Sequence, residues 1–132
     1  MTRVIVNGTF DILHRGHLEM LKYAKEQGDY LLVAIDTDAR VKELKGTSRP
    51  INNQSDRKFM LESLKYVDEV RFFNSKEELV SIIQEYKPDV MIKGSDYKDK
   101  SVVGKQNVPT VLFYDRTEHS TTKTIQDIID RR

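Results

Sequence analysis

The chain has 132 residues, with 22 lysines and arginines against 21 aspartates and glutamates, and no cysteine. A chain of this length is expected to form one domain, residues 1–132, with a sizeable core. The balanced charge argues against nucleic acid or an anionic membrane as partner. The lack of cysteine excludes disulfides and thiol catalysis. Without a membrane-length apolar run or a signal-like start, a cytoplasmic protein is the default expectation.

Short apolar runs alternate with helical patterns along the whole chain. Strands are expected at residues 4–6, 30–35, 66–73, 89–92 and 109–114. Helical spacing of apolar residues occurs within residues 18–25, 37–44, 59–64, 76–86 and 125–129. The expected inward faces of the third and last helices are Phe59, Met60, Leu61 and Leu64, and Ile125, Ile128 and Ile129. The alternation predicts an α/β fold, a Rossmann-like three-layer sandwich with a parallel sheet of about five strands. No Gly-x-Gly-x-x-Gly occurs, which argues against a dinucleotide oxidoreductase.

The segment Asn7-Gly-Thr-Phe-Asp-Ile-Leu-His-Arg-Gly-His17 joins the first strand to the first helix. Open α/β sheets bind ligands at the carboxyl ends of their strands. Gly8 permits close backbone approach, and the first amides of the helix can bind an anion, here a phosphate. His14 and His17 can face the same space and donate to phosphate oxygens. Their spacing is too short for a helical zinc pair. In the alternative interpretation, His14 is a loop residue and His17 caps the helix.

Charged residues also follow the second strand. Asp36 and Asp38 are either helix caps or substrate ligands. Residues 45–50 are rich in turn formers and carry Lys45 and Arg49, which predicts a loop. Asn53 or Ser55 then opens a helix with Arg57 in its first turn. A cation there is unfavourable with the helix dipole, so Arg57 needs an acidic partner: Asp56, solvent or a bound phosphate.

Two later segments combine polar groups with the ends of predicted strands. In Lys93-Gly-Ser-Asp-Tyr97, Asp96 can accept from a ribose or base and Tyr97 can stack on a base. The alternative is a turn residue and a half-buried aromatic. In Arg116-Thr-Glu-His-Ser-Thr-Thr122, the hydroxyl groups either cap the last helix or, together with Arg116, bind phosphates.

These motifs resemble known enzymes. Gly-Thr-Phe-Asp followed by His-x-Gly-His resembles the nucleotidyltransferase superfamily, in its cytidylyltransferase-like branch. Leu-Lys-Gly-x-Ser-Arg-Pro-x-Asn, Lys-Gly-x-Asp-Tyr and Val102-Val-Gly104 resemble the adenylyltransferase domain of bacterial ADP-heptose synthases, with Ser95 in place of a usual glycine. Arg-Thr followed by Ser-Thr-Thr resembles glycerol-3-phosphate cytidylyltransferases, one residue shorter than their Arg-Thr-x-Gly-x-Ser-Thr-Thr.

The resemblance implies transfer of a nucleotide from a nucleoside triphosphate to a phosphorylated sugar or polyol, with release of pyrophosphate. It favours ATP with D-glycero-D-manno-heptose 1-phosphate, giving ADP-heptose, with the sugar phosphate supplied by a separate kinase. CTP with glycerol 3-phosphate, giving CDP-glycerol, is the alternative, and a non-catalytic nucleotide-binding regulator is the alternative of another class. The resemblance also implies Mg²⁺ bound with the triphosphate, near Asp11 but without a dedicated protein site, and a homodimer.

Matching the motifs residue by residue assigns roles within this chain. The implied catalytic residues are His14, His17, Lys45 and Arg57. The implied nucleotide-binding residues are Gly8, Thr9, Phe10, Asp11, Gly16, Lys93, Gly94, Asp96, Tyr97, Arg116, Ser120, Thr121 and Thr122. Asp38 and Arg49 are implied to bind the acceptor, and no residue is assigned as a metal ligand.

Overall fold

The computed structural model describes residues 1–94, 102–115 and 121–131. Its helices and strands alternate along the chain, as the sequence predicts. They are β1 (Arg3–Gly8), α1 (Arg15–Glu26), β2 (Tyr30–Asp36), α2 (Asp38–Lys45), α3 (Gln54–Glu62), β3 (Glu69–Phe73), α4 (Lys76–Tyr86), β4 (Val90–Gly94), the short 3₁₀ helix η2 (Lys105–Asn107), β5 (Thr110–Tyr114) and α5 (Thr121–Asp130).

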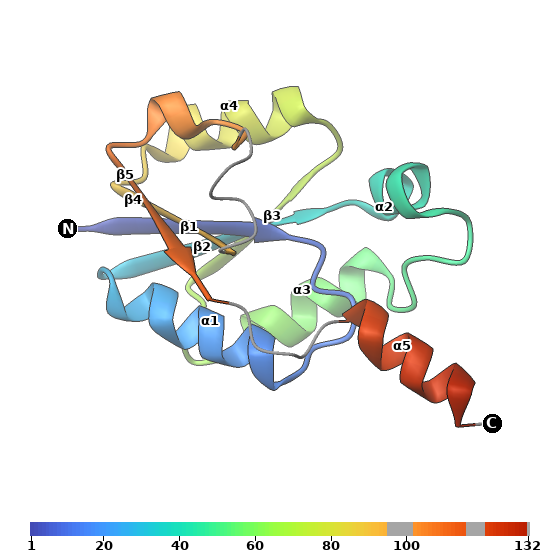
Figure 1. The fold of residues 1–132 in the computed structure, drawn as a ribbon. Helices are drawn as coiled ribbons and strands as arrows, with labels where there is room; N and C mark the ends of the chain where they lie inside the picture. Colours follow the sequence, from blue (N-terminus) through green and yellow to red (C-terminus); the bar gives the residue numbers. More distant parts are fainter. Residues whose placement is uncertain (95–101, 116–120, 132) are drawn as a thin grey trace.

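The five strands form one parallel sheet in the order β3-β2-β1-β4-β5, with β1 at its centre (Figure 1). The chain therefore starts in the middle, fills one side with β2 and β3, and then crosses to the other side with β4 and β5. The strand order reverses between β1 and β4. In open α/β sheets such a reversal leaves a crevice beyond the carboxyl ends of the two strands, where ligands bind.

Helices cover both faces of the sheet, because alternate residues of each central strand point to opposite sides. Val4 and Val6 of β1 pack in a core with Leu21 of α1 and Leu61 of α3. Ile5 lies in the opposite core together with Ile83 of α4. Figure 1 accordingly shows α1 and α3 on one side of the sheet and α4 on the other. The predicted three-layer sandwich is confirmed.

The structure decides which residues start and stop several helices. Thr37, rather than Asp36, caps α2 by accepting from the N–H of the residue three positions later. Asn53, rather than Ser55, caps α3 in the same way. Pro88 follows the end of α4, as predicted. Asp36 is therefore left for another role at the end of β2.

Two predicted apolar faces are partly wrong. In α3, Leu61 is buried, but Phe59 is 73% exposed and Met60 is 39% exposed. The inward face of α3 contains Arg57 and Leu61, one helical turn apart, so Phe59 and Met60, which lie between them in sequence, face outward. In α5, Ile128 and Ile129 are exposed, since this helix projects away from the sheet (Figure 1). The third strand also begins later than predicted, at Glu69 rather than residue 66.

Candidate active site

Charged side chains are buried at the end of the sheet where ligands are expected. Among the described residues, the buried polar or charged side chains are Asp11, Asp36 and Arg57. Asp11 follows β1, Asp36 ends β2, and Arg57 reaches both strand ends from α3. Burying charge is costly unless it is paired. Their gathering at the carboxyl ends of β1 and β2 marks this end of the sheet as the candidate active site.

The loop after β1 has a conformation that constrains its neighbours. Phe10 has a φ of 51°, in the left-handed region that side chains rarely adopt, and its ring is buried. A Cβ atom on Gly8 would lie only 3.0 Å from Cε2 of that ring. The Phe10 ring in turn lies 5.1 Å from the ring of His17, centroid to centroid. Gly8 is thus required for the packing of Phe10, and Phe10 helps to position His17.

His14 and His17 lie together at the start of α1, as their spacing predicts. Their rings stack with centroids 3.9 Å apart and planes at 22°. His14 is the N-cap, and its backbone N–H donates to Nδ1 of His17 at 3.3 Å. The alternative interpretation is right that His17 caps the helix, but His14 is the N-cap residue rather than an ordinary loop residue. Because Nδ1 of His17 accepts this bond, the neutral ring carries its proton on Nε2, on the far side from the helix cap.

Asp11 attaches the loop at residues 49–52 to the loop after β1. Its two carboxylate oxygens accept from the backbone N–H groups of Ile51 and Asn52, each at 2.8 Å. The Asn52 side chain donates to the Asp11 carbonyl at 2.7 Å. Arg49 Nε lies 3.5 Å from the same carboxylate, and Arg49 Nη2 is buried without a hydrogen-bond acceptor among the described residues. The Asp11 carboxylate thus positions Arg49. The contact of Asp11 with a nucleotide stays a prediction.

Arg57 is fully buried and binds four different parts of the site. Its Nε donates to the carbonyl of Asn52 at 3.0 Å. Its Nη1 donates to the carbonyls of Thr9 and Asp36, both at 2.9 Å, and its Nη2 donates to the Asp38 carboxylate at 2.8 Å. The acidic partner that its helix position requires is therefore Asp38, rather than its neighbour in sequence or a phosphate. With a side chain that is 0% exposed, Arg57 acts through the groups that it holds, and direct contact with a ligand is not supported.

A second ion pair lies at the end of β2. Arg40 Nε is 3.3 Å from the Asp36 carboxylate, and the guanidinium lies over the Phe73 ring. Burial raises the pKa of Asp36, and the nearby cations Arg40, Lys45 and Arg57 oppose that rise. Asp36 is predicted as either a helix cap or a substrate ligand but is not assigned to the predicted site, and Arg40 has no predicted role. The only sequence signal was an aspartate directly after a buried strand, which helix capping explained equally well.

Lys93 contacts β1 across the point of strand reversal. Its Nζ donates to Oδ1 of Asn7 at 3.1 Å. Gly94 is the last residue of β4. Asn7 is another residue without a predicted role, because nothing in its local pattern distinguishes it from an ordinary polar strand end.

The remaining predicted residues fall into three groups. Gly16 lies in the first turn of α1, and Lys45 is the exposed last residue of α2, one residue inside the helix rather than in the predicted loop. Thr121 and Thr122 begin α5, as the predicted helix start requires. Asp96, Tyr97, Arg116 and Ser120 lie outside the described residues, so their predicted roles stay predictions.

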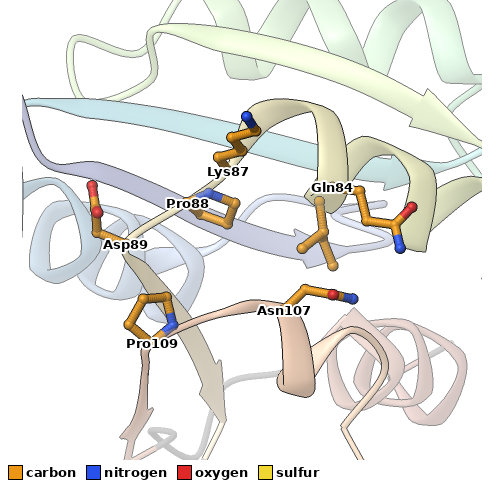
Figure 2. Close-up of a pocket in the computed structure, with 7 residues that line it drawn as sticks. Gln84, Lys87, Pro88, Asp89, Asn107 and Pro109 are labelled. Atoms are coloured by element: carbon orange, nitrogen blue, oxygen red, sulfur yellow. The ribbon is translucent and has the colours of Figure 1, made fainter.

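A surface hollow of roughly 340 Å³ lies elsewhere, between the end of α4 and η2 (Figure 2). Its lining residues include Gln84, Lys87, Asn107 and Pro109. Pro109 precedes β5, and the adjoining Asp89 precedes β4, so this hollow is at the amino ends of the strands. The carboxylate of Asp89 accepts a hydrogen bond from the backbone N–H of Arg3 at 2.9 Å. The hollow is therefore separate from the candidate active site.

Two further findings concern the described part of the chain. None of its helices has the length and apolar character needed to cross a membrane. No group of three or more histidine, aspartate or glutamate side chains in it is placed to hold a metal ion.

Replacing Arg57 tests its role as a buried connector. Arg57→Met is expected to lower the free energy of unfolding by about 3–5 kcal/mol, because Asp38 and three carbonyls lose their donor. Arg57→Lys is expected to recover only part of the loss, since one ammonium cannot reach all four acceptors. Urea denaturation measures both changes. Arg15→Ala is the control, because the Arg15 side chain is 81% exposed, and it should change little. Equal stability of Arg57→Met and the wild type would contradict the assignment.

The buried Asp36 carboxyl predicts a dependence of stability on pH. Since the folded protein raises its pKa, the protonated form is favoured by folding, and this contribution is lost as the pH rises through the folded value. Asp36→Asn keeps the shape without the charge. At pH 7 it is expected to unfold at a higher urea concentration than the wild type, with the difference shrinking in acid. Asp127→Asn, on the exposed surface of α5, controls for the loss of one negative charge. A variant that is less stable at pH 7 would show that the ion pair with Arg40 outweighs the burial.

Comparison with known proteins identifies the family of this chain. A family model described as cytidylyltransferase-like matches residues 5–127. The "Bifunctional protein HldE" of Campylobacter concisus is 48% identical over 130 residues, covering 98% of this chain and 27% of that protein. The protein of the same name from Nitratiruptor is 48% identical over 124 residues, covering 92% of this chain and 26% of that protein. This chain thus spans only about a quarter of these relatives.

A solved structure gives the same result for the fold. The lipopolysaccharide core biosynthesis protein from Thermoplasma volcanium matches with a TM-score of 0.72 and 28% identity, covering 89% of this chain and 99% of that one. The family model covers the strands, the paired histidines and the charged residues around them. The chain therefore belongs to the cytidylyltransferase-like family.

Proposed function

We propose that this chain is a nucleotidyltransferase that joins ATP to D-glycero-D-manno-heptose 1-phosphate, giving ADP-heptose and pyrophosphate. The observation that carries the transfer reaction is the stacked pair His14 and His17 at the start of α1, beside the point of strand reversal. The choice of substrates is supported by the likeness of residues 44–52 and 93–97 to ADP-heptose synthases. It is also supported by relatives named HldE that are 48% identical.

In the proposed reaction, an oxygen of the acceptor phosphate attacks the α-phosphorus of ATP. The new phosphorus–oxygen bond forms as the bond from the α-phosphorus to the oxygen bridging to the β-phosphate breaks, and pyrophosphate leaves with that electron pair. The acceptor phosphate is already ionised at neutral pH, so no general base is needed. The protein has to align the two substrates and neutralise the charge that develops on the leaving group.

His17 suits the second task. Its Nδ1 is used by the His14 backbone, and its Nε2 carries the proton in the neutral ring. A proton on Nε2 can be donated to a phosphate oxygen whose charge increases in the transition state. The backbone bond and the Phe10 ring hold this imidazole in place before substrate binds, which is the preorganisation that makes such donors effective. Stacked His14 is proposed to donate to a neighbouring phosphate oxygen.

Cations and helix amides are proposed to hold the rest of the substrates. Arg49 has a buried, unused Nη2 group among the described residues and is suited to the acceptor phosphate. Lys45 and Lys93 are proposed to contact phosphate oxygens, and Arg57 to keep the loop after β1 and the loop at residues 49–52 in register. The proposal places the β and γ phosphates at the start of α5 with Arg116 and residues 120–122, and the nucleoside at Asp96 and Tyr97.

Magnesium is proposed to enter with the triphosphate. Mg²⁺ keeps several waters and is commonly bound through substrate phosphates rather than by a protein cage. The oxygens of Asp11 already accept two backbone N–H groups, and the described residues offer no metal-binding group of three side chains. This arrangement is compatible with an ion that enters bound to the nucleotide phosphates. Once bound there, the ion would neutralise phosphate charge.

Cytoplasmic location and assembly as a homodimer belong to the same proposal. The homodimer rests on the family resemblance, and the cytoplasmic location is the default expectation from the sequence.

The substrates are tested by measuring pyrophosphate release from ATP, CTP, GTP and UTP, each with heptose 1-phosphate or glycerol 3-phosphate. Release is expected with ATP and heptose 1-phosphate. Release only with CTP and glycerol 3-phosphate would replace the proposal by the CDP-glycerol reaction. Tight binding of a nucleotide without release in any pairing would indicate a nucleotide-binding regulator.

His17→Ala tests the proposed charge stabilisation. Loss of one preorganised donor is expected to lower kcat by about 10²- to 10³-fold or more, with the unfolding transition close to that of the wild type. Steady-state pyrophosphate release and urea denaturation provide the two measurements. Arg15→Ala, in the same helical turn but exposed, is the matched control. A His17→Ala enzyme that retained its wild-type kcat would refute the role.

A further inference from the structure

Asn7 is a polar residue near the carboxyl end of the central strand. It lies one residue before the end of β1, opposite Ala34 of β2 in the parallel register. Alternation along the strand places its side chain on the same face as Ile5, which belongs to the core shared with α4. His17 and the buried Phe10 lie toward the other core. Asn7 therefore borders the crevice from the side opposite the histidines.

The Asn7 side chain bridges the point where the strand order reverses. The register of β1 with β4 pairs Val6 with Ile92, so Asn7 and Lys93 are the next residues on neighbouring strands. Lys93 Nζ donates to Asn7 Oδ1 at 3.1 Å, and the contact is partly buried. Asn7 directly precedes the loop with Gly8 and Phe10, and Lys93 directly precedes Gly94. One hydrogen bond thus joins the two strand ends that flank the expected ligand crevice.

The chemistry of this bond suits a lysine that has to meet an anion. A lysine side chain is flexible and loses about 2 kcal/mol of rotamer entropy when it is fixed. The Asn7 amide oxygen fixes one position of the ammonium without adding negative charge. At the same edge of the sheet, the carboxylates of Asp11 and Asp38 hold arginines by ion pairing instead. An asparagine at position 7 therefore orients the Lys93 ammonium without neutralising its positive charge, as a carboxylate would.

We propose that Asn7 is a positioning residue, which holds the Lys93 ammonium at the crevice between β1 and β4 so that it binds a phosphate group of the nucleotide. This inference rests on the proposed function, because it takes a nucleoside triphosphate as the ligand. Asn7 contributes through Lys93 and makes no contact with the reacting atoms.

Two substitutions of Asn7 separate this role from a purely structural one. Asn7→Ala removes the acceptor and is expected to weaken ATP binding about 10-fold, the size of a hydrogen bond to a charged group. Asn7→Asp keeps an acceptor of the same shape but pairs the ammonium with a negative charge. It is expected to weaken binding at least as much, with an unfolding temperature no lower than that of the wild type. If Asn7 only stabilised the fold, Asn7→Asp would bind ATP as the wild type does.

A double-mutant cycle tests whether the effect passes through Lys93. In a Lys93→Met background, Asn7→Ala is expected to have almost no further effect on ATP affinity. Full additivity of the two losses would overturn the proposal. Asn107→Asp, an exposed residue of η2 at the other end of the sheet, controls for the added charge and should leave ATP affinity unchanged.

Calorimetric titration with ATP and CTP gives these affinities without turnover, and steady-state kinetics should show a raised KM for the nucleotide with kcat largely retained. If the wild type binds nucleotide but releases no pyrophosphate, the proposed function fails while the titrations still decide the role of Asn7. If the wild type binds neither nucleotide, both proposals fail. An Asn7→Ala protein with wild-type nucleotide affinity overturns the inference alone.

Discussion

The buried guanidinium of Arg57 is the contact on which the geometry of the site depends. It binds the carbonyl of Thr9 after β1, the carbonyl of Asp36 at the end of β2, the carbonyl of Asn52 before α3, and the carboxylate of Asp38 in α2. Thr9, the end of β2 and Asn52 are far apart in sequence, and a buried carbonyl left without a donor costs about 1–3 kcal/mol. A single charge thus fixes the relative positions of two loops, one strand end and one helix.

Asp11 makes the complementary contact from the side of β1. As an anion it binds backbone N–H groups, while Arg57 as a cation binds carbonyl groups. Together they join the loop after β1 to residues 49–52 from both ends. The consequence is that Arg49 is brought within 3.5 Å of the Asp11 carboxylate, in the loop that precedes the histidines. The candidate site is therefore held by polar contacts, whereas the sheet beneath it is held by apolar packing.

The sequence predicted the sheet, the paired histidines and the helix starts because each depends on local spacing. Val4 to Val6 follow a strand pattern, and His14 and His17 are one helical turn apart. The roles of Asp11 and Arg57 could not be predicted, since their partners are backbone groups about 40 and 48 residues away, and backbone groups leave no mark in a sequence. The exposure of Phe59 has a related explanation. The local pattern suggested that Phe59 lies on the apolar face of α3, but Arg57 occupies the buried face, so Phe59 faces outward.

The nature of the Arg57 contacts has a consequence for how this chain can change over evolution. Three of its four acceptors are main-chain carbonyls, which every amino acid supplies. Side chains at positions 9, 36 and 52 can therefore be exchanged without removing an acceptor, provided that the backbone path is kept. Such an anchor leaves the framework insensitive to variation in the residues that surround the crevice. Substitutions there can change what the crevice binds, while the paired histidines remain where they are.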